Sequence, residues 1–397
     1  MIKTMSSHVL LSCSWRIAPT LGGYFNKLPT IASSAFIQCC QYSTGGSAGP
    51  FDRAMVSARD ARSRFLRQQR ARRLTDVNGL HAAADDETAS ATSNHEGDPD
   101  VVERVAAMSL ADRMLDCAHD AFERVCVVGT GRCAELTCEA VASKVSAHKR
   151  VSSIHVIGDD EKARELCVAA VRDASKGSVE ATHAHGDVEQ PPLARGDDYD
   201  AVLFPLVLHW CNRPDNALSA AREALQPDGL MLAAVLGGNT LASLRRACVL
   251  AELERRGGLA PRVSPSIRMR DAGNLLGATG FDTPAADAEK VRLRYPDAFA
   301  LVEHLRYMGG TSAASQTTAL TRDVALAAAA VASADSSNDD GSVDEEFEIL
   351  YLTGWSGGNG GGGGGGGGGD AGSRRAVQRG SATMSLADLA RELGTPP

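Results

Sequence analysis

The stretch VCVVGTGRC, residues 125–133, joins a short apolar run to a turn that contains two glycines. A short apolar run that ends at a turn predicts a buried strand, here residues 124–128. Glycine lets the backbone turn tightly and approach a ligand closely. In a parallel sheet such a turn lies at the carboxyl ends of the strands, where nucleotide cofactors bind. The sequence therefore predicts cofactor contacts at Gly129, Thr130 and Gly131.

The turn alone does not decide which cofactor binds. Gly129, Gly131 and Ala134 satisfy the dinucleotide pattern G-x-G-x-x-G/A. The turn that binds S-adenosylmethionine usually reads acid-x-Gly-x-Gly-x-Gly, whereas Val127 stands at the acid position here and Cys133 at the last glycine. The local pattern slightly favours a dinucleotide, and a strand-to-helix turn without a ligand is the alternative.

Apolar strands alternate with amphipathic helices from residue 100 onward. We expect strands at residues 124–128 and 154–157, a candidate third strand just before Asp187, a fourth strand from about 200, and further strands at 230–238 and 346–355. Helices are expected throughout the interval from 239 to about 333. Strands that are apolar throughout and separated by helices indicate a doubly wound α/β sheet, mostly parallel and covered on both faces.

Composition divides the remaining chain. Residues 1–48 contain no acid and many hydroxyl residues, which is typical of a mitochondrial transit peptide. Residues 49–99 form a basic helical segment followed by an acidic linker that we expect to be disordered. The domain then spans residues 100–356, a polyglycine insert residues 357–374, and a C-terminal tail residues 375–397.

The arginine-rich segment at residues 53–73 has several interpretations. It could dock on an acidic partner or on a cardiolipin-rich membrane. We favour a helix with a solvated face that also closes over the active site. The formal net charge of −8 argues against a general nucleic-acid binder. The ten cysteines form no CxxC pair, so we expect reduced, buried thiols and no structural zinc.

Several polar residues follow the predicted strands. Asp159 could bind a ribose or, like Asp160, cap the next helix. Asp187 could accept the adenine amine or be an ordinary loop acid. His183 and His185 alternate with Asp187, but isolated histidine pairs are common in loops, so we predict no metal site.

The fourth predicted strand supplies the remaining site candidates. We expect His209 and Trp210 to end this strand at the catalytic edge of the sheet, with Leu206 beside the cofactor. Trp210 could equally close the sheet edge as an amphipathic side chain.

The sequence resembles a known family over most of residues 51–389. The block from residue 205 to 265, which begins PLVLHWCNRPDNALSAAREALQPDG, carries the most specific likeness to the mitochondrial complex I assembly factor 5 family. FDR at 51–53, YDAV at 199–202, GNLLGATGF at 273–281 and RYPD at 294–297 also agree. This family lies within the class I methyltransferase superfamily and is related to BioC-type methyltransferases.

The resemblance implies a fold, a cofactor and a partner. It implies a Rossmann-like class I methyltransferase sheet of seven strands that binds S-adenosylmethionine in the mitochondrial matrix. Members are reported to hydroxylate an arginine on a core iron–sulfur subunit of complex I, so a complex I core subunit is the expected protein substrate. Contact with the inner membrane is a further expectation, and nucleic acid is not an expected partner. No residue named above identifies the oxidant for this hydroxylation.

Departures from the family pattern fall at the cofactor site and leave two other functions open. Gly158 aligns with the ribose-binding acid, and Asp159 follows one residue later. The first alternative is a non-catalytic assembly scaffold with a degenerate cofactor site. The second is a BioC-type O-methyltransferase that acts on a small substrate or an acyl carrier.

Overall fold

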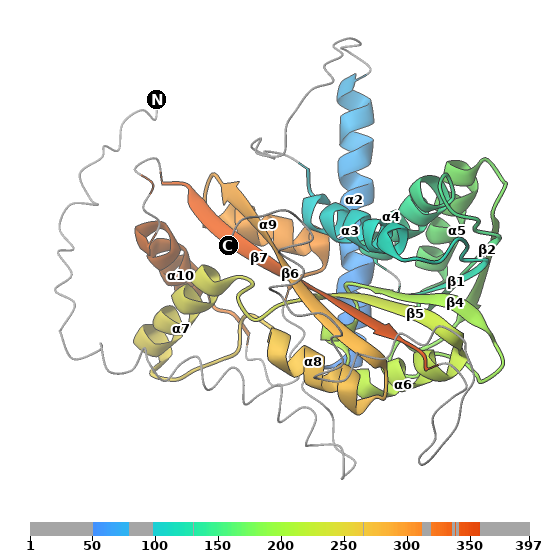
Figure 1. The fold of residues 1–397 in the computed structure, drawn as a ribbon. Helices are drawn as coiled ribbons and strands as arrows, with labels where there is room; N and C mark the ends of the chain where they lie inside the picture. Colours follow the sequence, from blue (N-terminus) through green and yellow to red (C-terminus); the bar gives the residue numbers. More distant parts are fainter. Residues whose placement is uncertain are drawn as a thin grey trace, which may run out of the picture.

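The computed structural model describes residues 51–78, 98–129, 131–264, 266–311, 319–335, 338 and 341–357. Within these residues the chain forms one seven-stranded sheet in the order β3-β2-β1-β4-β5-β7-β6 (Figure 1). Strands β1 to β5 are parallel, and β7 runs antiparallel to both of its neighbours. The strands are β1 Arg124–Val128, β2 Ser153–Gly158, β3 Glu180–His185, β4 Tyr199–Pro205, β5 Leu225–Leu236, β6 Asp282–Tyr295 and β7 Val343–Trp355.

The strands of the sheet centre are buried on both faces, as their unbroken apolar sequences predict. Successive side chains of a strand point to opposite faces. Val125 and Val127 of β1 accordingly belong to one hydrophobic cluster, while Cys126 and Val128 belong to another. Strands β4, β5 and β7 divide their side chains between the same two clusters. This alternation explains why each face needs its own layer of helices.

Helices cover both faces of the sheet (Figure 1). On one face lie α3 Val101–Asp116, α4 Arg132–Ala140 and α5 Glu161–Ser175, and on the other α6 Pro214–Ala224 and α8 Met269–Ala278. Beyond these layers α7 Ala242–Arg256 packs against α10 Arg322–Asp335, and α9 Ala298–Met308 packs against α2 Arg53–Asn78. The doubly wound, mostly parallel sheet predicted from the sequence is therefore confirmed.

One strand contradicts the sequence prediction. Residues 282–295 were expected to lie in a helical interval, but they form β6, which pairs along its length with β7. This segment, DTPAADAEKVRLRY, contains several good helix formers, and most of its side chains are at least partly exposed at the sheet edge. An edge strand lacks the continuous apolar signal of a central strand, so its partner rather than its own sequence decides its conformation.

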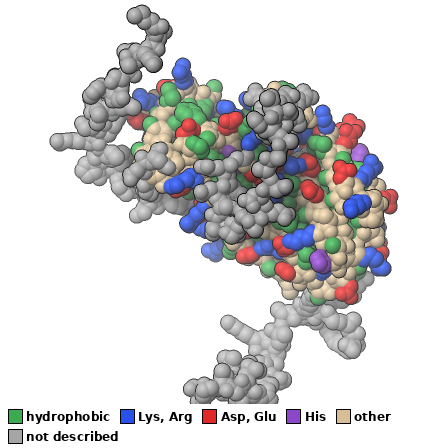
Figure 2. All heavy atoms as spheres, turned by 90° about the horizontal axis from the view of Figure 1, so that it is seen from above, with side chains coloured by type: hydrophobic (Ala, Val, Ile, Leu, Met, Phe, Trp, Pro, Cys, Tyr) green, Lys and Arg blue, Asp and Glu red, His purple; other side chains and the backbone are tan. Residues whose placement is uncertain are grey.

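Helix α2 confirms the helical prediction for the basic segment and lies over the carboxyl ends of the strands. Its side chains reach Asp187 after β3, Asp159 and Asp160 after β2, and Glu103 of α3. The interpretation that this helix closes over the site is the one that the contacts favour. The surface seen in Figure 2 carries Lys and Arg side chains interspersed with Asp and Glu, so this view shows no face of a single charge.

Some expectations fall on residues that the structure does not describe. The transit peptide at 1–48, most of the acidic linker, nearly all of the polyglycine insert and the tail at 375–397 are outside the described residues, as is Thr130. Within the described residues, no helix has the length and apolar character needed to span a membrane.

Candidate functional site

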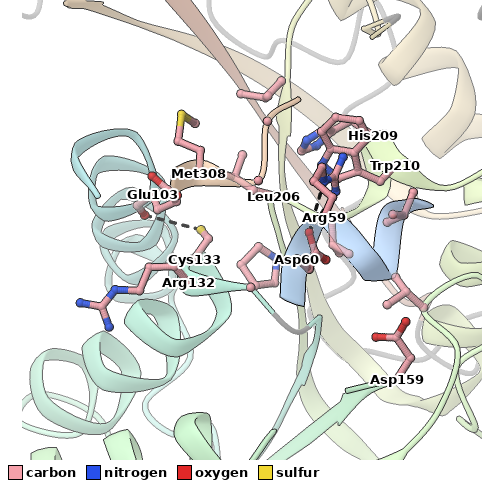
Figure 3. Close-up of a pocket in the computed structure, with 18 of the residues that line it drawn as sticks. Arg59, Asp60, Glu103, Arg132, Cys133, Asp159, Leu206, His209, Trp210 and Met308 are labelled. Carbon is pink, nitrogen blue, oxygen red and sulfur yellow. Dashed lines mark hydrogen bonds and ion pairs between the residues drawn. The ribbon is translucent and has the colours of Figure 1, made fainter. Parts of the chain in front are cut away.

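A cleft opens beside the glycine turn, at the carboxyl edge of the sheet (Figure 3). Its empty volume is about 740 Å³, part of which is open solvent. Its walls include parts of α2, the first turn of α3, the start of α4, the chain just after β2, the end of β4 with the turn that follows it, and the end of α9 with the two glycines after it. In an open α/β sheet this is the position at which ligands bind.

The glycine turn has the backbone geometry that a close ligand contact needs. Gly129 has a φ of +146°, a conformation that residues with a side chain rarely adopt. Its N–H donates to the carbonyl of Ile157 at 2.8 Å, which fixes the turn against β2. A Cβ at Gly131 would meet no atom within 4 Å, so the backbone borders open space there. Gly131 lines the cleft and is the N-cap residue of α4.

The two acids after β2 take different places. Asp160 caps α5, because its Oδ1 accepts from the N–H of Ala163 at 2.8 Å. Asp159 lines the cleft (Figure 3). Its Oδ2 accepts from the hydroxyl of Ser57 on α2 at 2.9 Å. The capping role that the sequence left open for both residues thus belongs to Asp160, and Asp159 remains the candidate for a ligand hydroxyl.

Asp187 lies apart from the cleft walls. Its Oδ1 accepts from Arg53 of α2 at 2.6 Å and from the N–H of Glu189 at 3.0 Å. Nearby on β3, His183 and His185 face the guanidinium of Arg164, at 3.4 and 3.5 Å. The positive charge of Arg164, which lies between the two histidine rings, would repel a metal ion at that position. Among the described residues, no group of three or more His, Cys, Asp and Glu is placed to hold a metal.

His209 and Trp210 line the cleft, but they do not end the fourth strand. Strand β4 stops at Pro205, and the two residues lie in a short 3₁₀ helix, Leu208–Trp210. The chain leaves β4 through Leu206, whose φ of +50° is strained for a residue with a branched side chain. This strained residue also lines the cleft, and strain of this kind is often found at functional sites.

Trp210 forms one side of a guanidinium site. The Cζ of Arg59 lies 3.6 Å from the centroid of the Trp210 ring, and the Arg59 side chain is only 7% exposed. Asp60 accepts from Nη2 of Arg59 at 3.1 Å and from Nε at 3.3 Å. An aromatic face combined with a carboxylate is the arrangement that binds a guanidinium group. Phe51 supports the ring from its edge, with 5.6 Å between the centroids.

Electrostatics limit what these side chains can do. Burial, together with the nearby charge of Arg59, lowers the pKa of His209 to about 3, so the ring is neutral at pH 7. Its Nδ1 is buried without a hydrogen-bond partner among the described residues. Burial also raises the pKa of Asp60, an effect opposed by Arg59. A neutral imidazole can donate or accept a hydrogen bond, but it is a poor proton acceptor at this pKa.

The cleft residues that the sequence reasoning missed include Arg59, Asp60 and Glu103. A signal for Glu103 exists in the sequence. It lies three, four and seven residues before Ala106, Ala107 and Leu110, which are all buried in α3. An acid on the buried stripe of a helix is unusual unless it has a partner or a function. Arg59 and Asp60 lie in a helix rich in arginine, so their spacing gives no comparable signal.

Comparisons with known proteins show which proteins this chain is similar to. A family model described as a methyltransferase domain matches residues 128–233. The protein named arginine-hydroxylase NDUFAF5, mitochondrial, from Rattus norvegicus is 34% identical over 283 residues, which are 71% of this chain and 74% of the relative. The protein of the same name from Danio rerio is 34% identical over 285 residues, or 71% and 79% of the two chains. A malonyl-[acyl-carrier protein] O-methyltransferase from Xylella fastidiosa (strain M23) is 28% identical over 246 residues, or 61% and 77%.

Proposed function

The chain belongs to the NDUFAF5 arginine-hydroxylase family of methyltransferase-fold proteins, and we propose that it hydroxylates an arginine of a respiratory complex I subunit in mitochondria. The observation that carries the proposal is the guanidinium site in the cleft. Trp210 and Asp60 already hold the guanidinium group of Arg59 beside the glycine turn. A substrate arginine brings the same planar, always charged group.

The residues of the cleft fit S-adenosylmethionine. Open space borders Gly131, so a ligand can approach the backbone of the turn there. The Asp159 carboxylate lines the same cleft, and a carboxylate can accept several hydrogen bonds at once, so it can accept from a ribose hydroxyl as it does from Ser57. Gly129, Gly131, Asp159 and Leu206 would hold the cofactor. Asp187 would take part only if the Arg53 contact were rearranged.

The chain's own residues position the reacting arginine. When bound, S-adenosylmethionine would supply a sulfonium centre, whereas the oxygen atom and the two-electron oxidant for the hydroxylation would come from a separate oxidant such as dioxygen. Trp210 would stack on the substrate guanidinium, and Asp60 would fix its orientation through N–H donors. The neutral His209 would offer a hydrogen bond without changing the charge of the site. Arg59 occupies this place at rest, so the substrate has to displace it, and α2 is the helix that carries it.

We expect an Asp159→Ala variant to bind S-adenosylmethionine at least about tenfold more weakly than the wild type. A hydrogen bond to a charged group contributes roughly 1.5–3 kcal/mol, which corresponds to this factor or more. Calorimetric titration measures the affinity. The control is Asp160→Ala, which removes the cap of α5 but no cleft residue. Equal affinities of the wild type and Asp159→Ala would assign Asp159 to the docking of α2 instead.

Deleting the gene in the source cells tests the proposed reaction directly. We expect mass spectrometry of purified complex I subunits to show one arginine without its added oxygen, restored when the wild-type chain is expressed again. The expected target is a core iron–sulfur subunit, and the expected compartment is the matrix, with a peripheral inner-membrane contact. Subunit arginines that are unchanged by the deletion would contradict the hydroxylase function.

A scaffold without catalysis is the second candidate, and one observation favours it. Two acids expected to bind the cofactor, Asp159 and Asp187, both contact α2. A scaffold would retain its complex I partner in a pull-down while leaving every arginine unmodified. A BioC-type methyltransferase would need no complex I partner, and its relative is the more distant one, at 28% identity.

A further inference from the structure

Glu103 is a buried carboxylate with one uncommitted oxygen. It lies in the first turn of α3 and is 4% exposed. Its Oε1 accepts from Nη2 of Arg67 on α2 at 2.6 Å. Its Oε2 is buried without a hydrogen-bond partner among the described residues. An unsatisfied buried acceptor is costly, and a charged one more so, which suggests that a ligand completes it.

The surroundings of Glu103 place it at the glycine turn. The thiol of Cys133 donates to the backbone carbonyl of Glu103 at 3.5 Å, and both residues line the cleft with Gly131 (Figure 3). Val127, which stands at the acid position of the turn motif, is instead buried in the core on the side of α3. A carboxylate therefore reaches the turn from a neighbouring helix, although the strand itself carries none.

We propose that Oε2 of Glu103 binds the α-ammonium group of S-adenosylmethionine. This inference rests on the cofactor named under the proposed function. The ammonium has three N–H donors, whereas the sulfonium has none. The substrate guanidinium has its own aromatic and carboxylate partners in Trp210 and Asp60. The ammonium is therefore the cationic donor that suits a lone carboxylate oxygen beside the turn.

The test compares two ligands that differ in the amino-acid part. S-Adenosylhomocysteine carries the ammonium and carboxylate groups, and 5′-methylthioadenosine lacks both. We expect Glu103→Gln in the full chain to weaken S-adenosylhomocysteine binding about 10- to 100-fold in calorimetry. The affinity for 5′-methylthioadenosine should stay within about twofold, which also shows that the variant is folded. Glu135→Gln is the matched control, because Glu135 pairs with Arg132 but does not line the cleft.

Each other outcome overturns the inference. Equal loss of both ligands would make Glu103 a structural residue, and no loss of either would remove it from the site. If Glu103→Gln weakened only N-acetyl-L-arginine methylamide, the carboxylate would belong to the substrate instead. Wild-type protein that binds neither nucleoside would refute the cofactor assignment itself, which distinguishes that failure from an error about Glu103 alone.

The pH dependence of binding provides a second readout. The pKa of Glu103 is raised to about 7, chiefly by burial; the charge of Arg67 on α2 opposes this rise and that of Asp100 adds to it. Cys133 of α4 and Tyr295 of β6 also face this carboxyl, and both have pKa values raised chiefly by burial. Only the ionised carboxylate attracts the ammonium, so affinity must rise as pH rises through about 7. We expect about a tenfold gain for S-adenosylhomocysteine from pH 6 to pH 8, and a flat profile for Glu103→Gln.

Discussion

An Asp60→Asn variant is expected to leave the target arginine of complex I mostly unmodified, with a rate reduced at least about 30-fold. Asp60 accepts from two nitrogens of the guanidinium that stacks on Trp210. Arg59 is buried while Asp60 is partly exposed, so removing the Asp60 charge costs about 2–5 kcal/mol because a buried guanidinium loses its partner. The measurement is mass spectrometry of the subunit from deletion cells that express the variant.

The control for this prediction is Asp116→Asn, which makes the same change at an exposed position at the end of α3. We expect it to restore modification fully. S-Adenosylhomocysteine binding by Asp60→Asn should match the wild type, because Asp60 belongs to the substrate side of the cleft. Full modification by Asp60→Asn would show that the Trp210 site holds Arg59 for structural reasons only.

The sequence predicts the centre of the fold because its central strands are buried on both faces. The predicted strand at residues 124–128 coincides with β1, and the turn after it borders the cleft. Asp159 also lies in the cleft, although it stands one residue beyond the position aligned with the ribose acid. Local patterns suffice here because strand, turn and helix follow one another directly in the chain.

The rest of the site depends on contacts between distant segments. Arg59 reaches Trp210 across 151 residues, and no local pattern records which helix covers the cleft. The prediction that His209 ends the fourth strand was wrong because Leu206 adopts a left-handed conformation and the strand stops at Pro205, although His209 still lines the cleft. A positive φ at a leucine cannot be read from its side chain, because tertiary contacts impose it.

Strand β6, which the sequence pattern did not predict, pairs along its length with β7. A substitution at a buried residue of β7 is therefore a strong test of the fold. We expect Phe347→Ala to lower the free energy of unfolding by about 3–5 kcal/mol, through lost burial and the cavity that remains. Phe347 is fully buried, and its ring meets that of His304 at 6.0 Å and 71°. For a domain of this size, the loss corresponds to a fall of roughly 10 °C in the melting temperature.

Comparing the thermal unfolding of Phe347→Ala with that of Phe299→Ala distinguishes the loss of a buried aromatic ring from the loss of an exposed one. Phe299 is 55% exposed on α9, and exposed substitutions usually change stability by less than about 0.5 kcal/mol. Strand β7 pairs with β5 on one side and β6 on the other, so a cavity there weakens the contact between the parallel strands and the edge strand. Equal melting temperatures for the two variants would mean that residue 347 is not in the core, which would contradict the order β5-β7-β6.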